Sequence, residues 1–144
     1  MLKMLHEVPV PARWLGCGGL IPFVAAAVAG LVGGPPLHDL SLRALLAYGA
    51  VILSFLGGVR WGLTIATPTP DSLFKELTIS VLPSLLGWAS LLLPLVCGLW
   101  ALAIGITAML VVDIQLPQAP LWYRLLRIPL SVGAISAMIV SLTV

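Results

Sequence analysis

The sequence predicts an all-α polytopic membrane protein, a bundle of five transmembrane helices, and three observations lead to this fold class. Of the 144 residues, 60% are hydrophobic and only 8% are charged, whereas soluble domains carry about 25% charged residues. The apolar residues gather in runs close to the roughly 20 residues that a helix needs to cross a bilayer. Stretches rich in proline, glycine and polar residues separate most of these runs.

The expected helices follow one another closely, and short turns join them. They cover residues 14–33, 43–66, 77–93, 95–112 and 123–144. The stretches "GGPPLHD" (33–39), "TPTPDS" (67–72) and "LPQAP" (116–120) mark their ends. Between the third and fourth runs, both slightly short for a full span, only Pro94 and the nearby Cys97–Gly98 intervene, so a tight hairpin is expected there. Residues 1–13 are expected to form a cytoplasmic segment before one compact bundle, 14–144.

The distribution of Lys and Arg predicts the orientation. Cytoplasmic loops carry an excess of these residues. With the N-terminus inside, only Arg43 faces outward, and the inner side holds Lys3, Arg13, Arg60, Lys75, Arg124 and Arg127. An aromatic belt at the same interface would consist of Trp14, Trp61, Trp122 and Tyr123. We therefore expect a cytoplasmic N-terminus and a C-terminus outside.

A cleaved leader is the alternative for the first helix. The small residues "AVA" (27–29) before Gly30 are similar to a signal-peptide cleavage site. The apolar stretch is long for a signal core, contains Pro22, and follows a region with Glu7. We therefore expect the first helix to be retained.

Rows of small residues predict where the helices pack. Lipid provides no hydrophobic drive between helices, so close backbone approach has to hold them together. In the second helix, one row spaced by four residues contains Ala50, Ser54, Gly58 and Gly62. Gly57 adds a second small-residue face to that helix, and Gly30 belongs to a comparable row in the first. Because it is small on two sides, the second helix is expected at the centre of the bundle.

Arg60 is the polar residue that most needs an explanation. It stands in "SFLGGVRWG" (54–62), six residues before the expected helix end at residue 66, or about 9 Å along the axis. Helical side chains lean toward the N-terminus of their helix, so Arg60 points deeper into the membrane, where a charge is costly unless it is paired. Asp113 ends the fourth run, which travels in the same direction, and no other acid is expected so close to the apolar core on that face.

Two interpretations of Arg60 remain open. An Arg60–Asp113 pair would hold the inner end of the bundle together. Alternatively, Arg60 would join Arg124 and Arg127 in a basic vestibule for an anionic head group, a phosphate or a quinone carbonyl, because basic pockets on the cytoplasmic side bind acidic lipids. Arg124 and Arg127 share a helix face, and ordinary positive-inside anchoring also accounts for them.

Three stretches resemble a known family. "WLGCGGLIPF" (14–23), "YGAVILSFLGGVRWG" (48–62) and "WYRLLRIPLS" (122–131) together look like the family called domain of unknown function 3429. That family includes bacterial proteins and the eukaryotic transmembrane protein 69 group. The resemblance implies a five-helix inner-membrane protein, mitochondrial in the eukaryotic relatives, and it transfers no catalytic residues. For this chain we expect a multi-pass protein of the bacterial inner (plasma) membrane.

The sequence contains none of the common motifs that would indicate an enzyme. The sequence has no HExxH motif, no P-loop and no cysteines at metal-ligand spacing, and His6 and His38 fall on opposite sides in the expected topology. We therefore predict no catalytic residue, no metal and no cofactor. A net charge of +2 is too small to indicate nucleic acid.

The sequence favours a non-catalytic scaffold, assembly or accessory factor. Sparse buried polarity, glycine-rich helix faces and short loops are typical of this class. The alternative is a binder or transporter of an anionic lipid, quinone or small anion at the basic vestibule. The expected partners are membrane lipids and either another membrane protein complex or further copies of the chain, and no nucleic acid.

Overall fold

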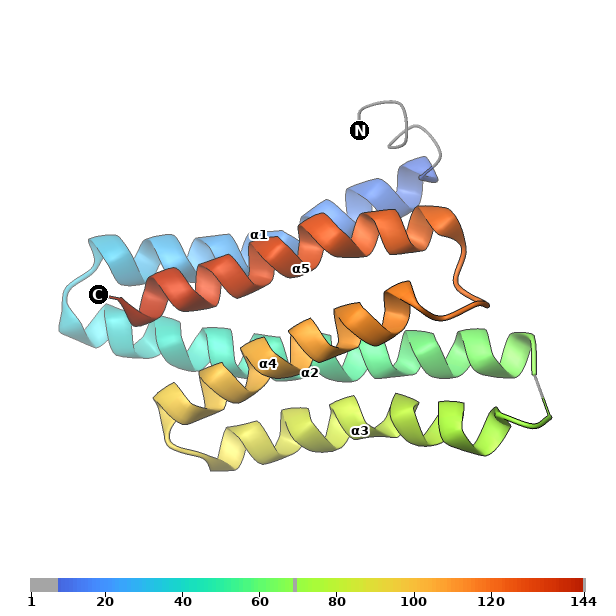
Figure 1. Cartoon of the computed structure of the whole chain (residues 1–144). Coiled ribbons are helices and arrows are strands. Elements are labelled where there is room, and N and C mark those ends of the chain that lie inside the picture. The colour runs from blue at the N-terminus through green and yellow to red at the C-terminus, as the bar shows by residue number, and fades with distance from the viewer. Residues whose placement is uncertain (1–7, 69, 144) are drawn as a thin grey trace. The chain divides into compact units, whose positions relative to one another are not determined.

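A computed structural model describes residues 8–68 and 70–143 of the chain, and it confirms the predicted all-α fold. Within these residues there are five α-helices and no strand (Figure 1). The helices are α1 (Val10–Val32), α2 (Pro35–Ala66), α3 (Leu73–Leu92), α4 (Leu95–Ile114) and α5 (Leu121–Leu142).

Every helix except α4 begins earlier than the apolar runs indicate, and the difference is largest for α2. α2 starts at Pro35, whereas the sequence predicted residue 43, because proline is well suited to the first helical turn, where its missing N–H would have no intrahelical partner. The polar residues 38 and 39 therefore belong to the helix, and the expected turn contracts to Gly33 and Gly34. α1 likewise starts at Val10, inside the segment expected before the bundle. Residues 1–7 of that segment lie outside the described residues.

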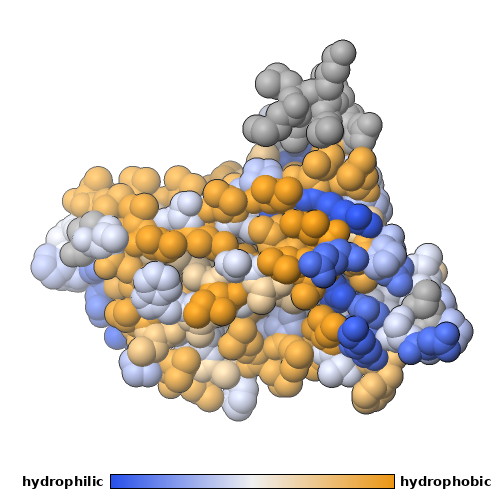
Figure 2. Space-filling model, viewed as in Figure 1, coloured by the Kyte–Doolittle hydropathy of each residue, from blue (hydrophilic) through white to orange (hydrophobic). Residues whose placement is uncertain are grey.

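Four of the helices, α1, α2, α4 and α5, are long and apolar enough to cross a membrane. Exposed apolar side chains cover most of the surface in view (Figure 2), as expected where lipid is the solvent. α3 is not among these four helices, and its first turns contain the charged residues Lys75 and Glu76.

The chain folds as two compact units, and α2 contributes to both. Unit 1 consists of the chain up to Leu45 together with Pro120 onward. In this unit α1 and α5 lie side by side (Figure 1). Gly16 of α1 faces Leu126 and Leu130 of α5, and further along both helices Leu20 faces Gly133. Since the contacts advance together in the two helices, α1 and α5 run parallel.

Unit 2, Leu46–Ala119, holds the rest of α2 with α3 and α4. Its helices approach so closely that glycines of one helix face backbone carbonyls of the next. Gly57 of α2 faces the Ser80 carbonyl, and Gly98 of α4 faces the Ser90 carbonyl. A Cβ added to Gly87 of α3 would come within 2.9 Å of the Ala50 carbonyl oxygen. Gly105 of α4 also faces Leu86 of α3, so the contacts advance in opposite directions and α3 is antiparallel to both of its neighbours.

Some of the small residues named from the sequence lie in contacts between helices, and others do not. Gly57 lies in a helix contact, and Gly87 faces Ala50 and Ser54. In unit 1, a Cβ on Gly30 would lie 3.2 Å from Cβ of Ser41. The other two members of the row in α2, Gly58 and Gly62, have nothing within 4 Å of a Cβ. That row therefore packs against α3 only in its first half, and the contact then passes to the face of Gly57.

We predict that Gly57→Ala destabilises the protein and that its neighbour Gly58→Ala does not. The added methyl group of Gly57→Ala would overlap the Ser80 backbone carbonyl, and overpacking of this kind costs about 1–3 kcal/mol. Gly58→Ala meets open space. Thermal unfolding in a mild detergent should show a lower Tm for Gly57→Ala only. Equal melting temperatures for the two variants would contradict the close α2–α3 contact.

Candidate functional site

The candidate site is a cluster around Arg60 in unit 2, formed by Arg60, Glu76, Val112 and Asp113. Arg60 lies near the end of α2, Glu76 in the first turn of α3, and Val112 and Asp113 in the last turn of α4. The side chain of Arg60 is only 4% exposed. One guanidinium therefore joins all three helices of the unit.

The guanidinium donates to three acceptors. Nη1 lies 3.1 Å from the Val112 carbonyl oxygen and 3.3 Å from Oδ1 of Asp113. Nη2 lies 2.5 Å from Oε2 of Glu76. The Asp113 side chain is 1% exposed and that of Glu76 is 16% exposed. Because a charge buried in apolar surroundings is costly unless it is paired and hydrogen-bonded, these acceptors explain how the fold accommodates Arg60.

The helix ends also suit the charges placed on them. The last carbonyls of a helix lack intrahelical partners and carry partial negative charge, whereas the first N–H groups carry partial positive charge. Arg60 donates to a carbonyl in the last turn of α4, where a cation is stabilised. Glu76 places its carboxylate in the first turn of α3, where an anion is stabilised. The end of α4 therefore attracts the Arg60 guanidinium, and the start of α3 favours the Glu76 carboxylate. Asp113 places a carboxylate at the negative end of α4, so it depends on Arg60 to compensate its charge.

The predicted contact between Arg60 and Asp113 is present, but Glu76 was missed. The expectation that no other acid approaches the apolar core was wrong. It failed because hydropathy placed the start of the third helix at residue 77, which left Glu76 in the preceding turn. α3 begins at Leu73. An acidic residue just before an apolar run is a known signal for a helix N-terminus, and it would have included Glu76 in the helix.

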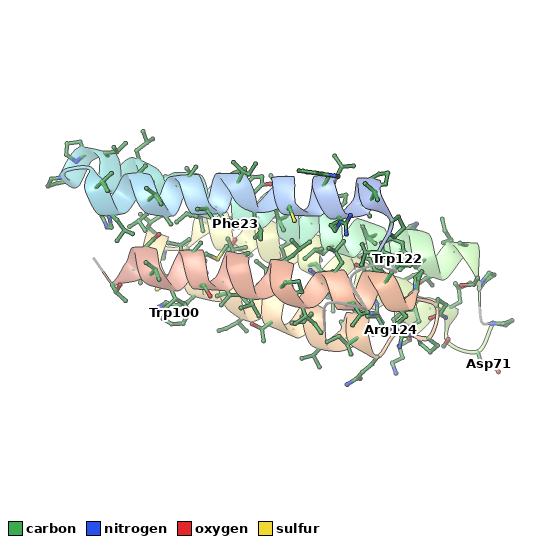
Figure 3. All side chains as sticks on the ribbon, turned by 90° about the horizontal axis from the view of Figure 1, so that it is seen from above. Phe23, Asp71, Trp100, Trp122 and Arg124 are labelled. Atoms are coloured by element: carbon green, nitrogen blue, oxygen red, sulfur yellow. The ribbon has the colours of Figure 1, made fainter. Side chains whose placement is uncertain are left out.

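Arg124 and Arg127 belong to unit 1. Arg124 lies in the first turn of α5 near Trp122 (Figure 3) and is half-buried. Arg127 is buried, and its Nη1 donates to Oγ of Ser131 over 3.1 Å. Since Arg60 belongs to unit 2, the vestibule expected from these three arginines stays a prediction.

The cluster is suited to holding helices together. Both terminal nitrogens of Arg60 already face carboxylates, so an incoming anion would meet the negative charges of Asp113 and Glu76. No group of three or more His, Cys, Asp or Glu residues in the described part of the chain is placed to hold a metal ion. Cys17 and Cys97 are free thiols, both exposed.

We predict that Arg60→Met is severely destabilising. It leaves the Asp113 and Glu76 carboxylates without their guanidinium partner, and breaking a buried ion pair from one side costs about 3–5 kcal/mol. Arg43→Met is the matched control, because Arg43 pairs with Asp39 across 3.5 Å while both side chains are more than 60% exposed, at 68% and 62%. Exposed pairs of this kind contribute at most about 1 kcal/mol. Thermal unfolding in detergent distinguishes the two variants.

Asp113→Asn should cost less than Arg60→Met in the same assay, because Arg60 keeps the Glu76 carboxylate and the Val112 carbonyl. A loss in Asp113→Asn as large as that in Arg60→Met would contradict a guanidinium shared between α3 and α4. Equal melting temperatures for Arg60→Met and Arg43→Met would contradict any structural role of the cluster.

Comparison with known proteins finds relatives along nearly the whole chain. The family described as "Protein of unknown function (DUF3429)" matches residues 8–143. Transmembrane protein 69 of Xenopus tropicalis is 39% identical over 145 residues, covering 98% of this chain and 57% of the frog protein. The mouse protein of the same name is 32% identical, covering 98% of this chain and 59% of its own length. The chain thus spans little more than half the length of these curated relatives. No solved structure matches.

Proposed function

The chain belongs to the DUF3429 family of membrane proteins, and from this premise we propose that it is a non-catalytic scaffold, assembly or accessory factor of a bacterial inner membrane. The observation that carries the proposal is the way in which Arg60 is used. Its guanidinium is engaged by Glu76, Val112 and Asp113 from two neighbouring helices. The buried charges of unit 2 therefore stabilise the unit instead of facing a substrate.

The packing of the unit supports the same function. Glycines against backbone carbonyls, such as Gly57 against Ser80, hold α2, α3 and α4 at fixed positions. A rigid group of helices with an apolar outer surface presents a constant shape to a neighbouring membrane protein. Trp88 on α3 and Trp100 on α4 are exposed, and Figure 3 shows Trp100. Tryptophan is enriched at interfaces because it offers a large contact area.

The proposed topology has five spans, with the N-terminus inside and the C-terminus outside. The parallel course of α1 and α5 supports this count. If α1, α2, α4 and α5 each cross the membrane in turn, then α1 and α5 run in the same direction only when α3 crosses as well. The excess of Lys and Arg that the sequence places on one side supports the orientation.

Reporter fusions should place the two ends of α5 on opposite sides of the membrane. Five spans with the N-terminus inside put residue 118 in the cytoplasm and residue 143 outside. Alkaline phosphatase fused after residue 143 should therefore be active in bacterial cells, and the same enzyme fused after residue 118 should be inactive. If α3 does not cross, both results are reversed, because α4 and α5 then change direction. That reversal would contradict the topology.

The proposed partners are membrane lipids together with either another membrane protein complex or further copies of this chain. Native mass spectrometry after extraction in a mild detergent tests this. We expect the wild-type chain to appear with additional protein subunits, and we expect no quinone or anionic small molecule bound in stoichiometric amount.

Arg124→Gln serves as the comparison in that measurement, because it removes a charge of the predicted vestibule and leaves the residues of the Arg60 cluster themselves unchanged. It should leave the spectrum of protein subunits unchanged. An anionic lipid or quinone mass that is bound to the wild type and lost in Arg124→Gln would contradict the scaffold function and favour the anion binder.

A further inference from the structure

Two buried polar atoms at the Arg60 cluster need an explanation. Nε of Arg60 and Oγ1 of Thr64 are buried, and no hydrogen-bond partner for either is found among the residues that the structure describes. Arg60 is 4% exposed and Thr64 is 1% exposed, so exchange with bulk water does not provide these atoms with a partner. Roughly 90% or more of buried polar groups in proteins have a partner. Two exceptions in one place therefore indicate a bound group.

The two atoms lie on one face of α2. Residues four apart in a helix are neighbours on its surface, and a helical side chain covers the turn that precedes its own Cα. Thr64 therefore covers the turn of Arg60 and lies beside the stem of the arginine. Both residues belong to unit 2.

Three other threonines of the chain form a hydrogen bond that the Thr64 hydroxyl does not form. Within a helix, a threonine hydroxyl commonly donates to the carbonyl four residues earlier. This bond is formed by Thr67 to Leu63, Thr78 to Phe74 and Thr107 to Ala103, with oxygen–oxygen distances of 3.1, 2.8 and 2.8 Å. The Thr64 hydroxyl is buried more deeply than these, yet it does not form this bond.

The charges nearby determine which kind of atom fits. The Arg60 Nε–H is a donor only, and a threonine hydroxyl both donates and accepts. An oxygen atom can accept from both. A third anion is disfavoured, because the carboxylates of Asp113 and Glu76 already face the guanidinium at 3.3 and 2.5 Å. We therefore propose that a neutral oxygen, from a buried water or from a carbonyl group of an amphiphile, binds between Arg60 Nε and Thr64 Oγ1.

The test observes the Arg60 Nε–H directly by NMR of the full chain, labelled with ¹⁵N, in detergent micelles. The sequence has five arginines, and single Arg→Lys variants at the other four assign the signal without changing Arg60: Arg13, Arg43, Arg124 and Arg127. We expect a cross-peak between the Arg60 Nε–H and a long-lived water. Thr64→Val should abolish this cross-peak, and Thr67→Val, at a hydroxyl already bonded to Leu63, should retain it.

If a carbonyl group is the source, the water cross-peak is missing and native mass spectrometry detects a neutral lipid, distinct in mass from a quinone, that is lost in Thr64→Val. Thermal unfolding gives an independent result. A bridging oxygen predicts a Tm lower by about 3 °C or more in Thr64→Val than in Thr67→Val. Thr64→Ser, which keeps the hydroxyl, should show a smaller loss.

The proposal is overturned if the wild type shows neither a water cross-peak nor a bound amphiphile. It is also overturned if Thr64→Val raises the Tm. Replacing a buried hydroxyl by a methyl group stabilises the fold only if the hydroxyl has no hydrogen-bond partner. The wild-type spectrum decides the question even if Thr64→Val does not fold.

Discussion

The need to satisfy one buried guanidinium determines how unit 2 is arranged. An arginine within an apolar helix requires acceptors, and Arg60 finds them on both neighbours at once. This requirement constrains the end of α4, which has to present the Val112 carbonyl and the Asp113 carboxylate together. It equally constrains the start of α3, where Glu76 has to lie within reach. The charge thus sets the relative positions of two helix ends that are far apart in the sequence.

Along the rest of the helices, contacts at glycines hold the helices close together. At Gly57, Gly87 and Gly98 the partner atom is a backbone carbonyl, so the separation of the helices depends on the absence of a side chain. Polar pairing at one end and close backbone approach along the length are independent means of holding the unit, and neither relies on a hydrophobic effect, which lipid does not supply. α2 carries both, because it contains Arg60 and Gly57. The central place that the sequence predicted for this helix stays a prediction.

The sequence predicted the helices and the Arg60–Asp113 contact because both depend on local information. Apolar runs reveal helices, and the direction of each helix determines which way a side chain leans. Glu76 was missed because hydropathy places helix ends poorly when a charged first turn precedes an apolar run. The sequence also could not predict that Gly57, and not Gly58, contacts α3. Adjacent glycines lie on different faces of the helix, and only the position of α3 determines which face is in contact. The parallel pairing of α1 with α5 depends on contacts between distant segments.

The lengths of the helices also bear on the kind of bilayer that can hold this protein. α3 and α4 have 20 residues each, about 30 Å at 1.5 Å per residue. This length matches the hydrocarbon layer of an average membrane and falls short of the roughly 32–33 Å of sterol-rich plasma membranes. α2 has 32 residues, about 48 Å, and can tilt or project beyond the layer. α4, one of the helices long and apolar enough to cross a membrane, has no such reserve. A thick bilayer therefore imposes a hydrophobic mismatch that costs fractions of a kcal/mol per Å, which favours thinner, sterol-poor membranes.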